Sequence, residues 1–148
     1  MSDSFQLDRF RIAQDTNETY ERALSELRAE RKATHWMWFV FPQLEGLGRS
    51  ATSQRYAIRS LAEARCYLRD PVLGKRLVDC AAILAALAGR SAEEIFGAID
   101  AMKLRSSMTL FARAAPHDRL FTKVLDDYFD GVPDAATEAL LDDRETWV

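Results

Sequence analysis

Helix start and stop signals recur along the whole chain, and they constrain its fold more than any other feature of the sequence. The Ser-x-x-Glu pattern of a capping box occurs at residues 60–63 and again at residues 91–94. Asp70 precedes Pro71, which places a capping side chain before a proline at the first helical position. Between these signals, apolar residues recur every three or four positions, as they do on helices with one buried face. The sequence therefore predicts a mainly helical chain.

Strand signals are scarce by comparison. No segment alternates apolar and polar residues over the length of a strand, and the Asp130-Gly131 pair follows an expected helix rather than joining a β-hairpin. We predict one compact all-α domain over residues 1–148, with about seven to nine short helices in orthogonal or superhelical packing. The expected helices cover about residues 17–27, 35–41, 53–58, 61–68, 71–88, 92–96, 101–115, 117–129 and 133–141, with Asp15 to Asn17, Ser60, Asp70, Ser91 and Asp100 as candidate caps.

Composition excludes several classes of protein. A chain of 148 residues, of which 48% are apolar, can bury a core without disulfides or a structural metal, and it is not of the disordered class. The formal net charge of −3 argues against general electrostatic binding of nucleic acid. Two cysteines and two histidines, with no Cys-x-x-Cys motif, are a poor set of metal ligands. We therefore expect no metal and no cofactor.

The sequence carries no signal for export or for membrane insertion. The start, Met1 to Phe5, has neither the basic region nor the apolar run of a secretory signal. The longest wholly apolar run, Cys80 to Ala88, is far shorter than the roughly 20 residues of a membrane span. We expect a cytoplasmic protein, in which the two cysteines act as small hydrophobic residues.

The first candidate for a functional site is the aromatic segment 35–41, with the sequence HWMWFVF. It has no partner strand, so we interpret it as a short buried helix that ends before Pro42. Trp36 and Trp38 cannot share one helix face, so one of them is expected to lie outside the main core, where it can stack on a flat ligand. His35 lies on the same side as Trp38 and is a candidate general acid or base. The alternative is that the segment is core and His35 a hydrogen-bonded structural residue.

The second candidate is the glycine loop that follows. Gly46 and Gly48 let the backbone approach a ligand closely, and Arg49 and Ser50 precede an expected helix, as in an anion-binding site. The loop is not a Walker motif, because the Gly-x-x-x-x-Gly-Lys pattern is absent. The alternative is a loop with an ordinary serine cap.

The third candidate is the polar face of the expected helix 101–115. Asp100, Lys103 and Ser107 share this face, and Ser106 lies at its margin. A lysine four residues before a serine can lower the barrier to proton transfer in a nucleophilic pair. The alternative is a solvated or capping face.

Charge is distributed unevenly along the chain. Residues 22–69 contain nine basic and four acidic residues, a net +5, whereas residues 126–148 contain one basic and eight acidic residues, a net −7. The basic segment contains both the aromatic segment and the glycine loop, which favours an anionic ligand there. The acidic end disfavours bulk binding of nucleic acid.

Three blocks of the sequence resemble a known family: HWMWFVFPQLEGLGRSATSQRYAI, LAEARCYLRDPVLGKRL and KLRSSMTLF. From about Phe5 to Leu141 the chain is similar to family 1810 of the domains of unknown function, found in bacteria and fungi and sometimes labelled calpastatin automatically. The resemblance implies an all-α fold and no particular activity. The calpastatin label implies nothing for this chain, because a short globular sequence does not resemble the disordered repeats of a protease inhibitor.

Our leading hypothesis is a pocket for a small anionic, nucleotide-like ligand, in a binding protein or in an enzyme that acts on the ligand, for example by glycosidic hydrolysis. A base would stack on Trp36 or Trp38, and phosphates would meet Arg49 and the loop at 46–53. The candidate ligand-binding residues are Trp36, Trp38, Gln43, Gly46, Gly48, Arg49, Ser50, Lys103 and Ser106, and the candidate catalytic residues are His35, Lys103 and Ser107.

An alternative of a different class is a protein–protein interaction module without chemistry. A third interpretation is a weak homodimer formed through an exposed aromatic face. The alternative to it is a monomer. No membrane partner is expected in any of the three.

Overall fold

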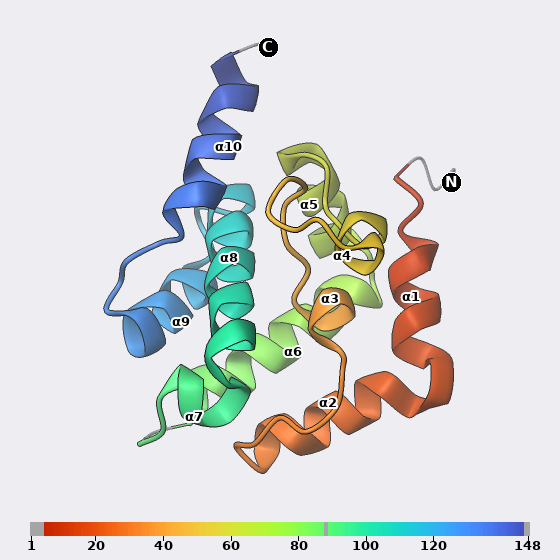
Figure 1. Ribbon diagram of the computed structural model, residues 1–148, viewed down its shortest axis with the longest axis vertical. Coiled ribbons are helices and arrows are strands. Elements are labelled where there is room, and N and C mark those ends of the chain that lie inside the picture. Colours follow the sequence, from red (N-terminus) through yellow and green to blue (C-terminus); the bar gives the residue numbers. More distant parts are fainter. Residues whose placement is uncertain (1–4, 88, 147–148) are drawn as a thin grey trace.

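The computed structural model describes residues 5–87 and 89–146, and within these ranges it contains helices and one isolated β-bridge but no strand (Figure 1). The prediction of an all-α fold is thereby confirmed. Residues 1–4, which carry most of the sequence used to argue against an export signal, lie outside the described residues. The elements are α1 (Asp8–Asp15), the 3₁₀ turn η1 (Thr16–Glu18), α2 (Thr19–Arg28), α3 (Met37–Val40), α4 (Ala51–Arg55), α5 (Leu61–Arg69), α6 (Leu73–Ala86), α7 (Ala92–Phe96), α8 (Ala98–Ala114), α9 (Arg119–Phe129) and α10 (Ala135–Thr146).

Helices α6 and α8 organise the core. Helix α8 packs against α5, α7, α9 and α10, and α6 packs against α2, α5 and α9. In Figure 1, α1 and α8 run along the long axis of the molecule, whereas α2 and α6 cross it. One hydrophobic cluster extends from Leu7, directly before α1, to Leu141 in α10, so helices from both ends of the described chain share the same core.

Local capping signals explain most helix starts. The capping box at 91–94 is formed, with the Ser91 side chain accepting from the Glu94 backbone and the Glu94 side chain accepting from the Ser91 backbone. Ser60 caps α5 as predicted, but Glu63 accepts from the backbone of Arg59 instead of completing the box. Each cap satisfies backbone N–H groups that have no partner within the helix.

Other boundary predictions are wrong. Helix α1 is not among the expected helices, and α2 starts after Glu18, which has a left-handed backbone and no capping hydrogen bond. Helix α8 starts at Ala98, directly after Gly97, whose φ of 81° breaks the preceding helix. Asp100 therefore lies within the first turn of α8 and does not cap it. Because Asp100 does not cap the helix, its carboxylate is available for lysine side chains.

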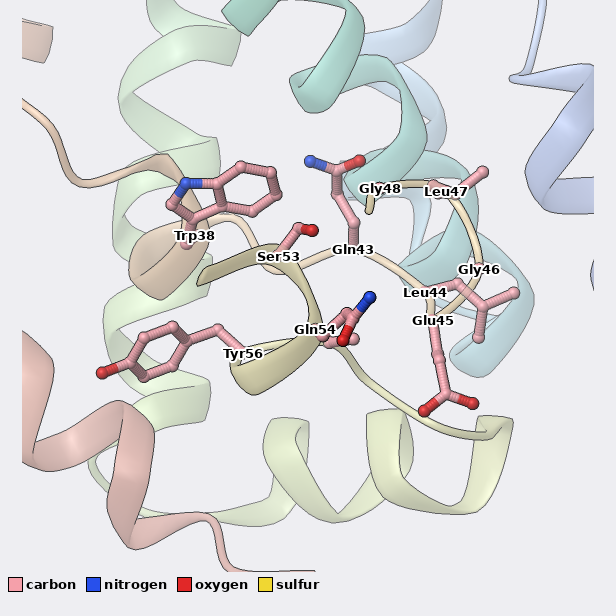
Figure 2. A pocket seen from close by; sticks show the side chains of 11 residues that line it. Trp38, Gln43, Leu44, Glu45, Gly46, Leu47, Gly48, Ser53, Gln54 and Tyr56 are labelled. Atoms are coloured by element: carbon pink, nitrogen blue, oxygen red, sulfur yellow. The ribbon is translucent and has the colours of Figure 1, made fainter. Parts of the chain in front are cut away.

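The segment between α3 and α5 forms a closed loop that holds the candidate site. Leu44 and Ile58 form an isolated parallel bridge, in which the Ile58 N–H donates to Gln43 O and the Glu45 N–H donates to Ile58 O, both at 2.8 Å. The bridge fixes the two ends of the segment that contains α4. It brings the glycine loop next to the aromatic helix α3, as Figure 2 shows.

No helix among the described residues has the length and apolar character needed to cross a membrane. The cytoplasmic location stays a prediction.

Candidate functional site

A small cavity of about 20 Å³ lies between α3, the glycine loop and α4. Figure 2 shows the side chains of Trp38, Gln43 and Ser53 converging on it. Its volume suffices for about one water-sized group. It is lined by Trp38, Gln43, Leu44, Glu45, Gly46, Leu47, Gly48, Ser53, Gln54, Tyr56 and Ala57, and we call it the Trp38 cavity.

Gln43 carries the most informative polar group of the Trp38 cavity. Its Nε2 atom is buried, and no hydrogen-bond acceptor among the described residues is within reach. Its backbone carbonyl accepts from Ile58, so the main chain is held by the β-bridge. A buried donor without an acceptor costs about 1–3 kcal/mol. An acceptor atom from outside the chain would satisfy this buried donor.

Glycine at position 48 is required by close packing. A Cβ atom there would lie 2.7 Å from both Cβ and Oγ of Ser53, and 3.9 Å from Cη2 of Trp38. The loop backbone thus packs directly against Ser53, and both Gly46 and Gly48 line the cavity. Ser50, however, caps α4 by accepting from the Ser53 N–H at 3.0 Å. The ordinary serine cap, the alternative interpretation of this loop, is therefore present, and Arg49 is exposed beside it.

A cluster of two lysines and one aspartate adjoins Trp38. The Asp100 carboxylate pairs with Lys32 Nζ at 2.8 Å and with Lys103 Nζ at 3.1 Å. Lys103 Nζ also lies 4.1 Å from the centroid of the Trp38 ring, a cation–π distance. Burial raises the pKa of Asp100, but hydrogen bonds from the two lysines outweigh it, and the pKa is lowered overall. The cluster Lys32–Asp100–Lys103 thus carries one net positive charge at neutral pH.

The two tryptophans have different environments. Trp36 is only 1% exposed and packs against Phe41 and Phe96, so its ring offers no surface for a ligand. Its indole N–H donates to Glu26 Oε1 at 2.9 Å. Trp38 is half-buried and lines the cavity. The expectation that one of the pair lies outside the main core holds for Trp38, and stacking on Trp36 is excluded by its burial.

The structure does not bring the candidate catalytic residues together. His35 is exposed in the bend before α3 and is not among the residues that line the Trp38 cavity. Ser107 is fully buried in α8, and its Oγ has no hydrogen-bond partner in the described part of the chain, so Lys103 does not bond to it. Ser106 is buried and donates to Met102 O. Within residues 5–87 and 89–146, no group of three or more His, Cys, Asp or Glu side chains is placed to hold a metal ion.

A buried polar network fixes the position of helix α3. Gln14 is 1% exposed, and its Nε2 donates to Phe39 O at 2.7 Å and to Tyr67 Oη at 3.1 Å. The Tyr67 hydroxyl donates to the same Phe39 carbonyl, and Arg76 donates to Gln14 Oε1. The carbonyl next to Trp38 is thus held by two donors, and the orientation of the site is set by residues far away in the sequence.

Several residues of this arrangement were not identified from the sequence. Glu26 and Lys32 belong to no motif, because a single acidic or basic residue on an amphipathic helix or in a loop is usually solvated. Tyr56 and Gln54 lie in the segment expected to be helical, and both line the cavity. No signal in the sequence distinguishes them from ordinary surface residues.

Comparison with known proteins places the chain in a family context. The model of a family described as a protein of unknown function (DUF1810) matches residues 4–141. The crystal structure of the conserved hypothetical protein Rv1873 from Mycobacterium tuberculosis is similar, with 51% sequence identity and a TM-score of 0.91, over 95% of this chain and 99% of that chain. The search of the curated proteins finds no match.

Proposed function

The chain belongs to the DUF1810 family of proteins of unknown function, and we propose that it binds a small anionic, nucleotide-like ligand at the Trp38 cavity. The observation that carries this proposal is the buried Nε2 of Gln43, which has no acceptor in the described residues. A ligand oxygen placed in the cavity would recover the about 1–3 kcal/mol that an unsatisfied donor costs.

The cavity size defines how such a ligand would bind. A volume of about 20 Å³ admits one oxygen or a group of similar size, and no ring. The ligand would therefore insert one carbonyl, hydroxyl or phosphoryl oxygen next to Gln43. The remainder would lie over Trp38 and the glycine loop, where Gly46 and Arg49 are exposed.

Glu45 is the charged residue of the cavity lining, but two cations beside the cavity, outside that lining, favour an anion. Lys103 is the outer lysine of the cluster, with 22% of its side chain exposed, and its ammonium lies over the Trp38 ring. An anionic group that approaches Trp38 meets this ammonium first. Arg49 would supply a second positive charge from the loop.

Rigid support of helix α3 favours a preformed site over an incidental surface hollow. Phe39 O is held by Gln14 and Tyr67, and Trp36 is held by Glu26. Sites whose supporting residues are locked by hydrogen bonds lose little entropy when a ligand binds.

We assign no reaction to the site. Glycosidic hydrolysis requires a general acid within hydrogen-bond reach of the bond that breaks. His35 does not line the cavity, and Ser107 is buried without a hydrogen bond to Lys103, so neither candidate meets this requirement as placed.

The experiment is thermal unfolding in the presence of nucleoside phosphates, cyclic nucleotides, dinucleotides and sugar phosphates. A ligand at 100 times its Kd should add about 2.7 kcal/mol to the free energy of unfolding. Gln43→Leu should abolish the stabilisation by ligand, while leaving the free protein as stable as the wild type or more so, because it removes an unsatisfied donor. Gln54→Leu is the matched control, since Gln54 also lines the cavity but its exposed amide already donates to Arg49 O.

Two results would overturn the proposal. One is the absence of stabilisation by every compound in the panel. The other is a stabilisation that Gln43→Leu leaves intact.

One observation favours the alternative, a protein–protein interaction module. Ile99 and Met102, one turn apart on α8, are 74% and 67% exposed, which is unusual for large apolar side chains. If the nucleotide panel gives no stabilisation, light scattering over a range of concentrations tests a weak homodimer. A constant monomer mass, unchanged in Ile99→Ser, would exclude a homodimer through this face.

A further inference from the structure

We infer that helix α1 is an exchangeable element, and that two copies of this chain form a dimer by swapping it. In this dimer α1, η1 and α2 join into one continuous helix, and each α1 docks on the other copy. The inference goes beyond the proposed ligand site. It comes from the backbone of the turn at 16–18 and from the contacts that α1 makes.

The turn between α1 and α2 contains two residues in a strained backbone conformation. Asn17 has φ 53° and ψ 32°, and Glu18 has φ 57° and ψ 34°, so both are left-handed. This conformation is unfavourable for residues with a side chain, although asparagine tolerates it better than glutamate does. Figure 1 shows that α1 meets α2 at a sharp corner there. Because the turn contains neither glycine nor proline, a right-handed backbone at Asn17 and Glu18 would relieve the strain and join the two helices.

A continuous helix would carry α1 away from its present position. It would be straight and about 30 Å long. The buried residues of α1 include Phe10 and Gln14, and those of α2 are Tyr20, Ala23 and Leu27. At 3.6 residues per turn, these two sets would lie about 130° apart around a common axis. Helix α1 would therefore project from its own chain with its buried face uncovered.

A second copy offers everything that this uncovered face needs. Phe10 is fully buried, and its ring centroid lies 5.2 Å from that of Tyr67 in α5. Arg9 Nη2 donates to Glu63 Oε2 and to Ala57 O, both at 2.7 Å. These partners all follow α2 in the chain, so the other copy can supply them without distortion. The exchange changes only the turn and the packing of α1 beside α2.

The exchange also couples the two copies through helix α3. Gln14 in α1 donates to Phe39 O at 2.7 Å, next to Trp38. In the swapped dimer this hydrogen bond comes from Gln14 of the partner subunit. Each copy therefore holds the other's α3 in position.

Refolding at two protein concentrations tests the exchange. The protein is unfolded in urea and refolded at about 10 μM and at about 1 mM, because a swap needs α1 to be undocked while a second copy is near. Chromatography with light scattering then gives the mass of each product. We expect monomer at the lower concentration and, at the higher one, a dimer that persists after dilution. A product that is wholly monomeric at both concentrations, in Asn17→Ala as well as in the wild type, would overturn the inference.

Three variants at left-handed positions measure the contribution of the turn. Glu18→Gly relieves the strain in the monomer and weakens the continuous helix, so it should lower the association constant of the dimer about 100-fold, or about tenfold per chain. Asn17→Ala has the opposite effect on both states and should raise the constant. Glu30→Gly is the matched control, because Glu30 is also left-handed, with φ 59°, but lies after α2. It should leave the constant unchanged, and a dimer that responds equally to Glu18→Gly and Glu30→Gly would contradict the swap.

A charge exchange between Arg9 and Glu63 shows whether α1 itself is swapped. Arg9→Glu and Glu63→Arg each place two like charges together in the monomer. When the two variants are refolded in equal amounts, a swapped heterodimer lets each α1 meet an opposite charge. The mixture should therefore contain more dimer than either variant alone, and the absence of this gain would refute the exchange. If circular dichroism shows that either variant is unfolded, the turn variants decide the question.

The swapped dimer differs from a dimer through the exposed face of α8. Ile99→Ser should leave it intact, because Ile99 lies on α8 and takes no part in the docking of α1. A dimer that this substitution dissociates would be held by the α8 face, and the swap would be wrong.

Discussion

Glu26 is the residue whose replacement tests the packing around the site most sharply. Its carboxylate accepts four hydrogen bonds from the segment before α3. Oε1 accepts from the backbone N–H groups of Ala33 and Thr34 and from the indole N–H of Trp36, and Oε2 accepts from the Thr34 hydroxyl. The indole N–H is the critical donor, because Trp36 is 1% exposed and water cannot replace the carboxylate there.

Glu26→Ala should lower the free energy of unfolding by about 2–4 kcal/mol. An orphaned buried indole N–H costs about 1–3 kcal/mol, and the partly exposed donors, which water can reach, add about 1 kcal/mol in total. Glu26→Gln keeps one acceptor oxygen for the indole N–H but loses the charge and the oxygen that accepts from the Thr34 hydroxyl, so its cost should be about 1 kcal/mol. Urea unfolding followed by circular dichroism gives both values.

A double-mutant cycle with Trp36→Phe isolates the indole bond. Phenylalanine has no N–H to orphan, so Glu26→Ala should cost less in the Trp36→Phe background, with a coupling energy of about 1–2 kcal/mol. Equal costs for Glu26→Ala and Glu26→Gln, or a coupling energy near zero, would show that the bond from the Trp36 indole N–H to Glu26 does not stabilise the fold.

Three further predictions concern stability. Burial opposes ionisation of Glu26, but its hydrogen bonds lower the pKa from 4.5 to about 2. The ionised form of Glu26 therefore stabilises the fold above about pH 4.5. This contribution is lost as the pH falls toward 2. Wild-type stability should fall more steeply over that range than that of Glu26→Gln, and parallel acid titrations of unfolding would contradict the assignment. A Cβ on Gly74 would lie 2.0 Å from the carbonyl oxygen of Leu68, so Gly74→Ala should lower the free energy of unfolding by about 3 kcal/mol. A melting temperature equal to that of the wild type would show that α5 and α6 do not pack this closely. Tyr67→Phe removes one of two donors to Phe39 O and should lower the free energy of unfolding, measured by calorimetry, by about 1 kcal/mol. A decrease above about 3 kcal/mol would mean that the network does more than orient α3.

Local signals made most of the fold predictable. The caps at Ser60 and Ser91 act within one turn, so their positions in the sequence fix the starts of α5 and α7. Helix α1 escaped prediction because Leu7 gives no capping side chain and only Phe10 and Gln14 are buried along it. A helix that is stabilised by tertiary contacts, without its own cap or apolar stripe, leaves little trace in a sequence.

The site was predictable only where its residues are neighbours in the chain. Trp38, Gln43 and Gly48 lie within one short segment, which the β-bridge at Leu44 ties to Ile58. The choice between Trp36 and Trp38 as the outer tryptophan depends on Glu26, which lies on a different helix. The contact of Lys103 with Trp38 depends likewise on how α8 packs beside α3. Such long-range relations follow from packing, and the sequence pattern does not contain them.

The most direct test of the account is the NMR signal of the Gln43 side-chain amide during a titration with adenosine nucleotides. Nitrogen-15 labelling resolves the side-chain amides, and Gln43→Leu identifies this one by its loss. We expect the Gln43 amide to shift and saturate together with the Trp38 indole N–H, while the buried Trp36 indole N–H stays in place. Saturable binding that moves other amides and leaves Gln43 unchanged, or no shift of any signal, would show that this donor does not receive the ligand.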